Sequence, residues 1–168
     1  MGLEYKKMSL FDAPEGSIIV HACNAQGSWN SGIAKEFKER YPRSFQHYEE
    51  YCRLNPRHLK VGRGKLLSST IEHKHKVGIL ITSNKYGAEK DPKELIKIQT
   101  TLAINQLLET NLAAHGRNPS VKGIIYSNKF NSGLFKVPWK ETELILTTVL
   151  KHYSWITWIV CDPNHETD

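Results

Sequence analysis

Four short runs of apolar and β-branched residues are the feature that most constrains how this chain can fold. Each run has the length of a strand and ends in a polar segment, as buried strands do. The runs are 17–22, 77–82, 123–127 and 155–161. Apolar residues at helical spacing lie between them and predict helices over 31–40, 42–54, 92–110 and 139–153. Strands that alternate with helices predict a three-layer α/β domain with a mostly parallel sheet.

Weaker patterns complete this outline. Strands are also predicted over 3–10 and 65–69, a loop over 111–120 and a polar tail over 162–168. The 168 residues suit one domain, which we place at 1–161, because single domains commonly hold about 100–200 residues. Ligands bind beyond the carboxyl ends of the strands in such sheets, so the loops that follow the strands are where a site is expected.

Composition excludes some classes of protein. No apolar run approaches the roughly 18–20 residues of a membrane span, and no secretory signal is visible at the N-terminus. The three cysteines are Cys23, Cys52 and Cys161; they are odd in number, far apart and not spaced as zinc ligands. They indicate a reducing compartment, cytoplasmic or nuclear, and no bound metal. The net charge of +6 indicates an anionic partner.

A basic stretch leaves nucleic-acid binding open as one alternative. It contains no acidic residue and consists of Arg53, Arg57, His58, Lys60, Arg63 and Lys65. Such a stretch could contact a phosphate backbone. Few aromatic residues are interleaved with it, so a solvated basic face is the preferred interpretation and a nucleic-acid partner is not expected.

The segment after the first buried strand is rich in small residues and opens a helix. It reads His-Ala-Cys-Asn-Ala-Gln-Gly-Ser-Trp-Asn-Ser-Gly-Ile-Ala over 21–34. Small residues let the backbone approach a ligand closely, and the first N–H groups of a helix face an anion. The P-loop and dinucleotide-binding motifs are both absent. Spacing alone fits a phosphate cradle and an ordinary strand–turn–helix connection equally well.

A second segment, 128–139, also joins a strand to a helix. Its Asn-Ser-Gly turn at 131–133 would offer several free N–H groups. Leu134, Phe135 and Val137 are apolar where a plain turn would be polar. They could form the wall of a pocket, although the segment taken alone is better explained as a loop folded back on the core.

Together the two segments resemble the macro domain family, and within it the fungal ADP-ribose 1″-phosphate phosphatases. The likeness runs from Glu4-Tyr5 to the last predicted strand. Its most specific part reads Asn-Ser-Gly-Leu-Phe-Lys-Val-Pro-Trp-Lys-Glu-Thr-Glu over 131–143. The resemblance implies a mixed six-stranded sheet between helices, with ADP-ribose across the carboxyl ends of the central strands and no cofactor.

The resemblance also implies which residues bind the ligand. Adenine would lie on the turn at Met8, Ser9 and Leu10, where Ser9 replaces an acidic residue or asparagine that is common in the family. The diphosphate and the distal ribose would lie on residues of the two segments: Ala22, Cys23, Asn24, Trp29, Asn30, Ser31, Gly32, Ile33, Ala34, Asn131, Ser132, Gly133, Leu134, Phe135 and Lys136. A three-glycine run of the family is reduced here to one glycine at 32, which predicts a shifted backbone angle in the loop.

Two catalytic residues are predicted, His21 and Asn24. A histidine can hold a phosphate when charged and can shuttle a proton near neutral pH; the alternative for His21 is a structural hydrogen bond to the backbone. Asn24 matches a family asparagine that binds the distal ribose, and its amide both donates and accepts. Cys23 lacks the phosphate loop of cysteine phosphatases and is better explained as a core residue. Ser83 and Phe135 replace the lysine–aspartate pair of macrodomains that hydrolyse ADP-ribosyl esters.

The implied function is metal-independent hydrolysis of ADP-ribose 1″-phosphate, a by-product of tRNA splicing, to ADP-ribose and phosphate. Water would attack phosphorus while hydrogen-bond donors stabilise the equatorial oxygens. Two alternatives use the same pocket: removal of ADP-ribose from modified proteins, and non-catalytic reading of ADP-ribose. We expect a monomer whose partner is an ADP-ribose derivative or an ADP-ribosylated protein.

Overall fold

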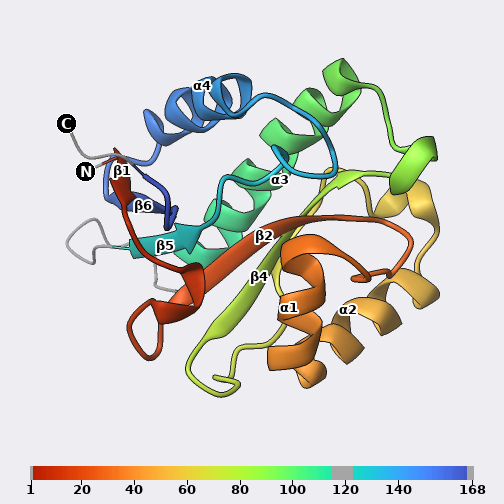
Figure 1. Cartoon of the computed structure of the whole chain (residues 1–168), viewed down its shortest axis with the longest axis horizontal. Coiled ribbons are helices and arrows are strands. Elements are labelled where there is room, and N and C mark those ends of the chain that lie inside the picture. The colour runs from red at the N-terminus through yellow and green to blue at the C-terminus, as the bar shows by residue number, and fades with distance from the viewer. Residues whose placement is uncertain (1, 115–122, 166–168) are drawn as a thin grey trace.

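The computed structural model describes residues 2–114 and 123–165, in which one six-stranded sheet lies between two pairs of helices (Figure 1). The strands are β1 (Gly2–Lys6), β2 (Ile18–Asn24), β3 (Gly64–Leu66), β4 (Lys76–Ser83), β5 (Gly123–Ser127) and β6 (Ile156–Cys161). Their order across the sheet is β1-β6-β5-β2-β4-β3, and every neighbouring pair is parallel except β3 and β4. The predicted mixed, mostly parallel sheet is confirmed.

The helices cover both faces of this sheet. They are α1 (Gly32–Arg40), α2 (Pro42–Leu54), α3 (Lys93–Ala114) and α4 (Trp139–Leu150). β2 shows why three layers form, because successive side chains of a strand point to opposite faces. Ile19 belongs to the core that includes Phe37 of α1, whereas Val20 belongs to the core that includes Ile104 of α3 and Leu146 of α4. None of the helices in the described ranges is long and apolar enough to cross a membrane.

Several element ends differ from the predictions. The first strand stops at Lys6, because 10–12 form a 3₁₀ turn whose N-cap, Ser9, accepts a hydrogen bond from the N–H of Phe11. The helix predicted over 92–110 continues to Ala114, so the predicted loop begins later, and 115–122 lie outside the described residues. The polar tail is described as far as residue 165.

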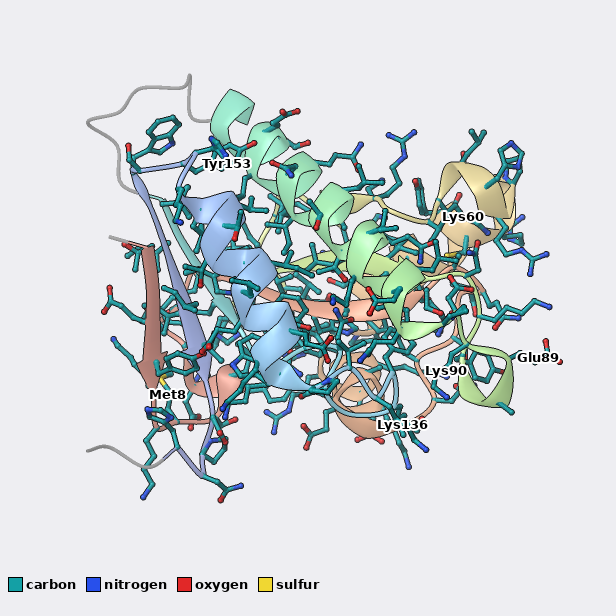
Figure 2. All side chains as sticks on the ribbon, turned by 90° about the horizontal axis from the view of Figure 1, so that it is seen from above. Met8, Lys60, Glu89, Lys90, Lys136 and Tyr153 are labelled. Atoms are coloured by element: carbon teal, nitrogen blue, oxygen red, sulfur yellow. The ribbon has the colours of Figure 1, made fainter. Side chains whose placement is uncertain are left out.

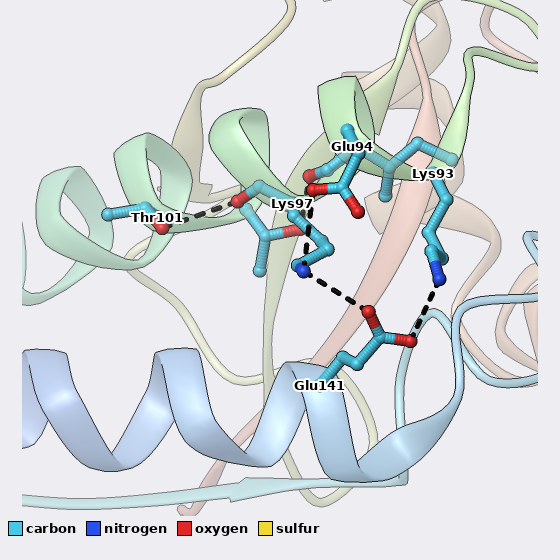
Figure 3. A network of polar contacts seen from close by, with 7 residues as sticks. Lys93, Glu94, Lys97, Thr101 and Glu141 are labelled. Carbon is cyan, nitrogen blue, oxygen red and sulfur yellow. Dashed lines mark hydrogen bonds and ion pairs between the residues drawn. The ribbon is translucent and has the colours of Figure 1, made fainter.

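Ion pairs join the first turns of α3 and α4 (Figure 3). The carboxylate of Glu141 lies 3.2 Å from the Lys93 ammonium and 3.1 Å from that of Lys97, which also pairs with Glu94 at 3.4 Å. Solvent screens such pairs, so they add little to stability. The ion pairs connect α3, which follows the loop after β4, with α4, which follows the loop after β5.

Candidate ligand-binding site

A cavity of about 830 Å³ lies at the carboxyl ends of the parallel strands. This volume falls within the roughly 300–1,000 Å³ of small-molecule sites. Four segments line it: parts of 22–34 at the end of β2 and beyond, 86–90 after β4, 128–136 after β5 and 161–163 at the end of β6. The two loops that were singled out in the sequence therefore meet around one cavity.

Most of the predicted binding residues line this cavity. They are Ala22, Cys23, Asn24, Asn30, Ser31, Gly32, Ile33, Ala34, Asn131, Ser132, Gly133, Leu134, Phe135 and Lys136. Sequence reasoning missed Tyr86 and Lys90 after β4, and Asp162 and Pro163 after β6. Both groups follow predicted strands, so the rule that ligands bind at the carboxyl ends of strands could have found them.

Four predicted binding residues lie elsewhere. The cavity does not reach Met8, Ser9 or Leu10, so the predicted adenine turn is not part of it. Leu10 is buried in the core, and the hydroxyl of Ser9 is used to cap the turn that follows. Trp29 is fully buried and stacks on Tyr48, with ring centroids 4.8 Å apart, so it is a packing residue.

His21 does not line the cavity either. It is fully buried, stacked on Phe37 at 4.1 Å between ring centroids and edge-on to Trp29 at 4.6 Å. Burial lowers the pKa of His21 from 6.5 to about 3, and the nearby backbone of Ala22 opposes only part of this shift. Neither ring nitrogen has hydrogen-bond geometry with any group in 2–114 or 123–165. This placement favours a neutral core histidine over the predicted catalytic role.

Strand periodicity explains this position. Ile19 and Cys23 belong to the core beneath α1 and α2, and His21 lies between them on the same face of β2. The predicted alternative was a structural hydrogen bond to the backbone; the backbone of Ala22 does act on the ring and partly opposes the fall in its pKa, although no bond of full hydrogen-bond geometry is formed.

Asn24 lines the cavity, but its amide mainly shapes the loop. Its Oδ1 accepts hydrogen bonds from the N–H groups of Gln26 (2.9 Å) and Ser28 (3.4 Å) and from the Tyr48 hydroxyl (3.0 Å). Its Nδ2 donates to the carbonyl oxygen of Ser28 at 2.8 Å, which leaves one N–H for a ligand. The position supports a scaffold role that includes at most one ligand contact, and not a catalytic role.

The N-terminus of α1 provides a first set of free donors. Ser31 is the N-cap and makes no capping hydrogen bond through its side chain. Among the described residues, the N–H groups of Gly32, Ile33 and Ala34 have no acceptor. Such groups bind anions. Gly32 has φ of +61°, whereas Asn30 and Ser31 lie outside the positive-φ region, so the loss of two family glycines requires no strained angle here.

The loop after β5 provides a second set. Asn131 directly precedes these donors and has a φ of +66°. Its carbonyl oxygen accepts a hydrogen bond from the N–H of Val137 at 2.9 Å. Its side chain turns into the protein: Oδ1 accepts from Thr82 at 2.8 Å, and Nδ2 donates to Thr100 at 2.9 Å. The N–H groups of 132–135 have no acceptor within the part of the chain that is described. Asn131 thus positions donors rather than offering its own amide.

The cavity wall carries more positive than negative charge. Lys90, Lys129 and Lys136 line it, and Asp162 is the one carboxylate among its described lining residues. Lys129 and Asp162 form an ion pair of 3.0 Å. The wall suits an anionic ligand.

Burial raises the pKa of the Cys23 thiol, so it is neutral, as expected of a core residue and unlike a nucleophile.

The basic stretch is not simply a solvated face. Lys60 is buried, and its Nζ donates to the carbonyl oxygen of Cys52 at 2.6 Å. The ammonium of Lys65 lies 4.1 Å from the centroid of the Tyr51 ring. Two of the charges proposed for RNA contact are therefore used within the fold.

Comparison with known proteins agrees with this geometry. The Macro domain family model matches residues 20–146. Relatives named ADP-ribose 1″-phosphate phosphatase include a protein of Aspergillus fumigatus, 34% identical over 82% of this chain and 84% of its own length. A Lodderomyces elongisporus protein of that name is also 34% identical, over 87% and 91%.

Solved structures share the fold at low identity. The macrodomain of Mycobacterium tuberculosis DarG has a TM-score of 0.71 and is 17% identical, with 98% of this chain and 100% of that one covered. Thermosipho africanus DarTG in complex with ADP-ribose has a TM-score of 0.73 and is 15% identical, with 100% of this chain and 43% of that one covered.

Proposed function

The chain belongs to the macro domain family, and we propose that it is a hydrolase that converts ADP-ribose 1″-phosphate to ADP-ribose and phosphate. The names of its fungal relatives support the substrate. The observation that carries the proposal is the meeting of two sets of unpaired N–H groups, from α1 and from the loop at 132–135, around one positively charged cavity.

The geometry suggests how the reaction is helped. The N–H groups of the two loops would bind phosphate oxygens, and the lysines would offset their charge. Water attacks phosphorus, the phosphorus–oxygen bond to the ribose breaks, and a proton passes to the departing sugar oxygen. Fixed donors stabilise the charge on the equatorial oxygens, and in phosphoryl transfer such positioning supplies most of the acceleration. His21 takes no part.

The protein is further proposed to act as a monomer in a reducing compartment, cytoplasmic or nuclear. The three cysteines, which are free and buried, support the choice of compartment.

Gly32→Ala tests the cradle at α1. The left-handed conformation costs an L-residue about 1–2 kcal/mol, so the first turn of α1 shifts and kcat/KM for phosphate release falls about tenfold or more. Gly16→Ala is the matched control, because Gly16 has φ of +89° but does not line the cavity. Its kcat/KM is expected to stay near that of the wild type. Equal losses in the two variants would contradict the assignment of the cradle.

The same assay in EDTA tests the proposed activity itself. We expect the wild type to release phosphate from ADP-ribose 1″-phosphate at full rate without added metal. Loss of release in EDTA that returns with a divalent cation would overturn the metal-independent mechanism.

A reader of ADP-ribose is the second candidate, and one observation favours it. No histidine lines the cavity in the described residues, and its one carboxylate, Asp162, is paired with Lys129, so donors for binding are present without an obvious general base. Tight binding of ADP-ribose by the wild type, with no phosphate release at any enzyme concentration, would replace the phosphatase by the reader.

A further inference from the structure

The two ends of the cavity differ in charge. In the strand order, β6 and β4 lie on opposite sides of β5 and β2, whose loops carry the free N–H groups. The β6 end holds Asp162, whose carboxylate lies 3.0 Å from the Lys129 ammonium. The N–H of Asn164 and this ammonium keep the pKa of Asp162 below its usual value, so the carboxylate is charged. The β6 end is therefore close to neutral overall.

The β4 end holds an unpaired cation. Lys90 lines the cavity, is partly buried and forms no ion pair with any carboxylate in 2–114 or 123–165. Its neighbour Glu89 pairs instead with Lys85 at 3.0 Å, and neither of these two lines the cavity. Figure 2 shows Lys90 near Lys136 and far from Met8 beside β1.

The backbone at Lys90 is held in place. The next residue, Asp91, accepts hydrogen bonds at Oδ2 from the N–H of Asn84 (2.8 Å) and from Gln99 (3.0 Å). The N–H of Asp91 donates to the hydroxyl of Ser83 at 3.0 Å, and the N–H of Lys90 donates to a carbonyl oxygen within the same loop. The backbone that carries Lys90 is therefore fixed beside the cavity, and its side chain extends from a defined position.

We propose that Lys90 is the residue that recognises the terminal phosphate of the substrate, which then lies at the β4 end of the cavity. This rests on the proposed function. The substrate has a diphosphate in its middle and a more highly charged phosphate monoester at one end. The paired charges of Lys129 and Asp162 leave the β6 end without net attraction for such a group, whereas the unpaired Lys90 attracts it. The uncharged adenine of the substrate then lies toward the β6 end. Because ADP-ribose lacks the terminal phosphate, Lys90 favours the phosphorylated form over ADP-ribose.

Lys90→Gln removes the charge and keeps a polar side chain that is only one atom shorter. The variant loses a charged hydrogen bond to the terminal phosphate. We therefore expect kcat/KM for ADP-ribose 1″-phosphate to fall about tenfold or more. The inhibition constant of ADP-ribose, which lacks the terminal phosphate, is expected to change by less than about twofold. Lys85→Gln, in the same loop but outside the cavity, is expected to change neither quantity. Lys90→Arg, which keeps the charge, should retain most of the preference.

Two results would overturn the proposal. Equal losses for both compounds would show that Lys90 binds the diphosphate or shapes the cavity. Unchanged kcat/KM for ADP-ribose 1″-phosphate and unchanged inhibition by ADP-ribose would show that the Lys90 ammonium does not contact a phosphate. If the wild type releases no phosphate, the proposed function fails but Lys90 is still tested by calorimetry. The preference for ADP-ribose 1″-phosphate over ADP-ribose must then be lost in Lys90→Gln and kept in Lys85→Gln.

Discussion

Acidification from pH 6.5 toward pH 3 is expected to destabilise the wild type by up to about 5 kcal/mol more than a His21→Leu variant. The unfolded chain binds a proton at His21 with a pKa of 6.5, whereas burial in the folded protein lowers this pKa to about 3. The unfolded state therefore binds more protons between these values, and the free energy of unfolding falls as the pH falls. Leucine is similar in volume to histidine and does not titrate, so its variant lacks this contribution.

Urea unfolding of both proteins at several pH values between 4 and 7 measures this difference, of which about 3 kcal/mol is expected to be present at pH 4. Carboxylates affect the two proteins alike and cancel when the curves are subtracted. Ile19→Val serves as the control, because Ile19 lies in the same core and carries no titrating group, so its curve should run parallel to that of the wild type. Parallel curves for the wild type and His21→Leu would show that the pKa of His21 is the same in the folded and unfolded protein, against its placement in the core.

The same variant separates packing from catalysis. Because the ring of His21 faces Phe37 and not the cavity, His21→Leu should keep most of the phosphatase activity at neutral pH. A complete loss of release, with ADP-ribose affinity and stability retained, would restore His21 as a catalytic residue.

Local pattern was enough to predict the layers and the two central loops. The β-branched runs at 17–22 and 77–82 became β2 and β4, since continuous apolar runs of this length suit strands covered on both faces. The helix predicted over 42–54 coincides with α2 because proline starts it. The loops at 21–34 and 128–139 were singled out because each follows a predicted strand, but their pattern alone left an ordinary connection open, and the family resemblance assigned them to the ligand.

The direction of side chains could not be predicted in the same way. Asn131 was expected at the ligand, yet its amide bonds to Thr82 and Thr100, which are 49 and 31 positions away in the chain. Only the folded sheet brings these groups together. Lys90 and Asp162 were missed because neither loop contains a motif, and their position depends on how β4 and β6 flank the central strands.

Asn131→Ala is expected to lower the free energy of unfolding by about 3 kcal/mol. Alanine at φ of +66° costs about 1–2 kcal/mol, and the hydroxyl of the fully buried Thr82 loses its acceptor, which costs about 1–3 kcal/mol more. Thr100 also loses a donor but still donates to the carbonyl oxygen of Ile96. Chemical denaturation measures the loss.

Two controls divide this loss into its causes. Asn131→Gly accepts the positive φ and removes only the hydrogen bonds, so it should be less destabilising than alanine. Asn128→Ala removes a nearby amide whose buried Oδ1 has no partner among the described residues, and it is expected to cost less than about 1 kcal/mol. A loss in Asn131→Ala no larger than that in Asn128→Ala would contradict the assigned role. If Asn131→Gly keeps the stability of the wild type but releases phosphate slowly, the buried amide serves to hold the donors of 132–135 in place, and its hydrogen bonds matter more for the site than for the fold.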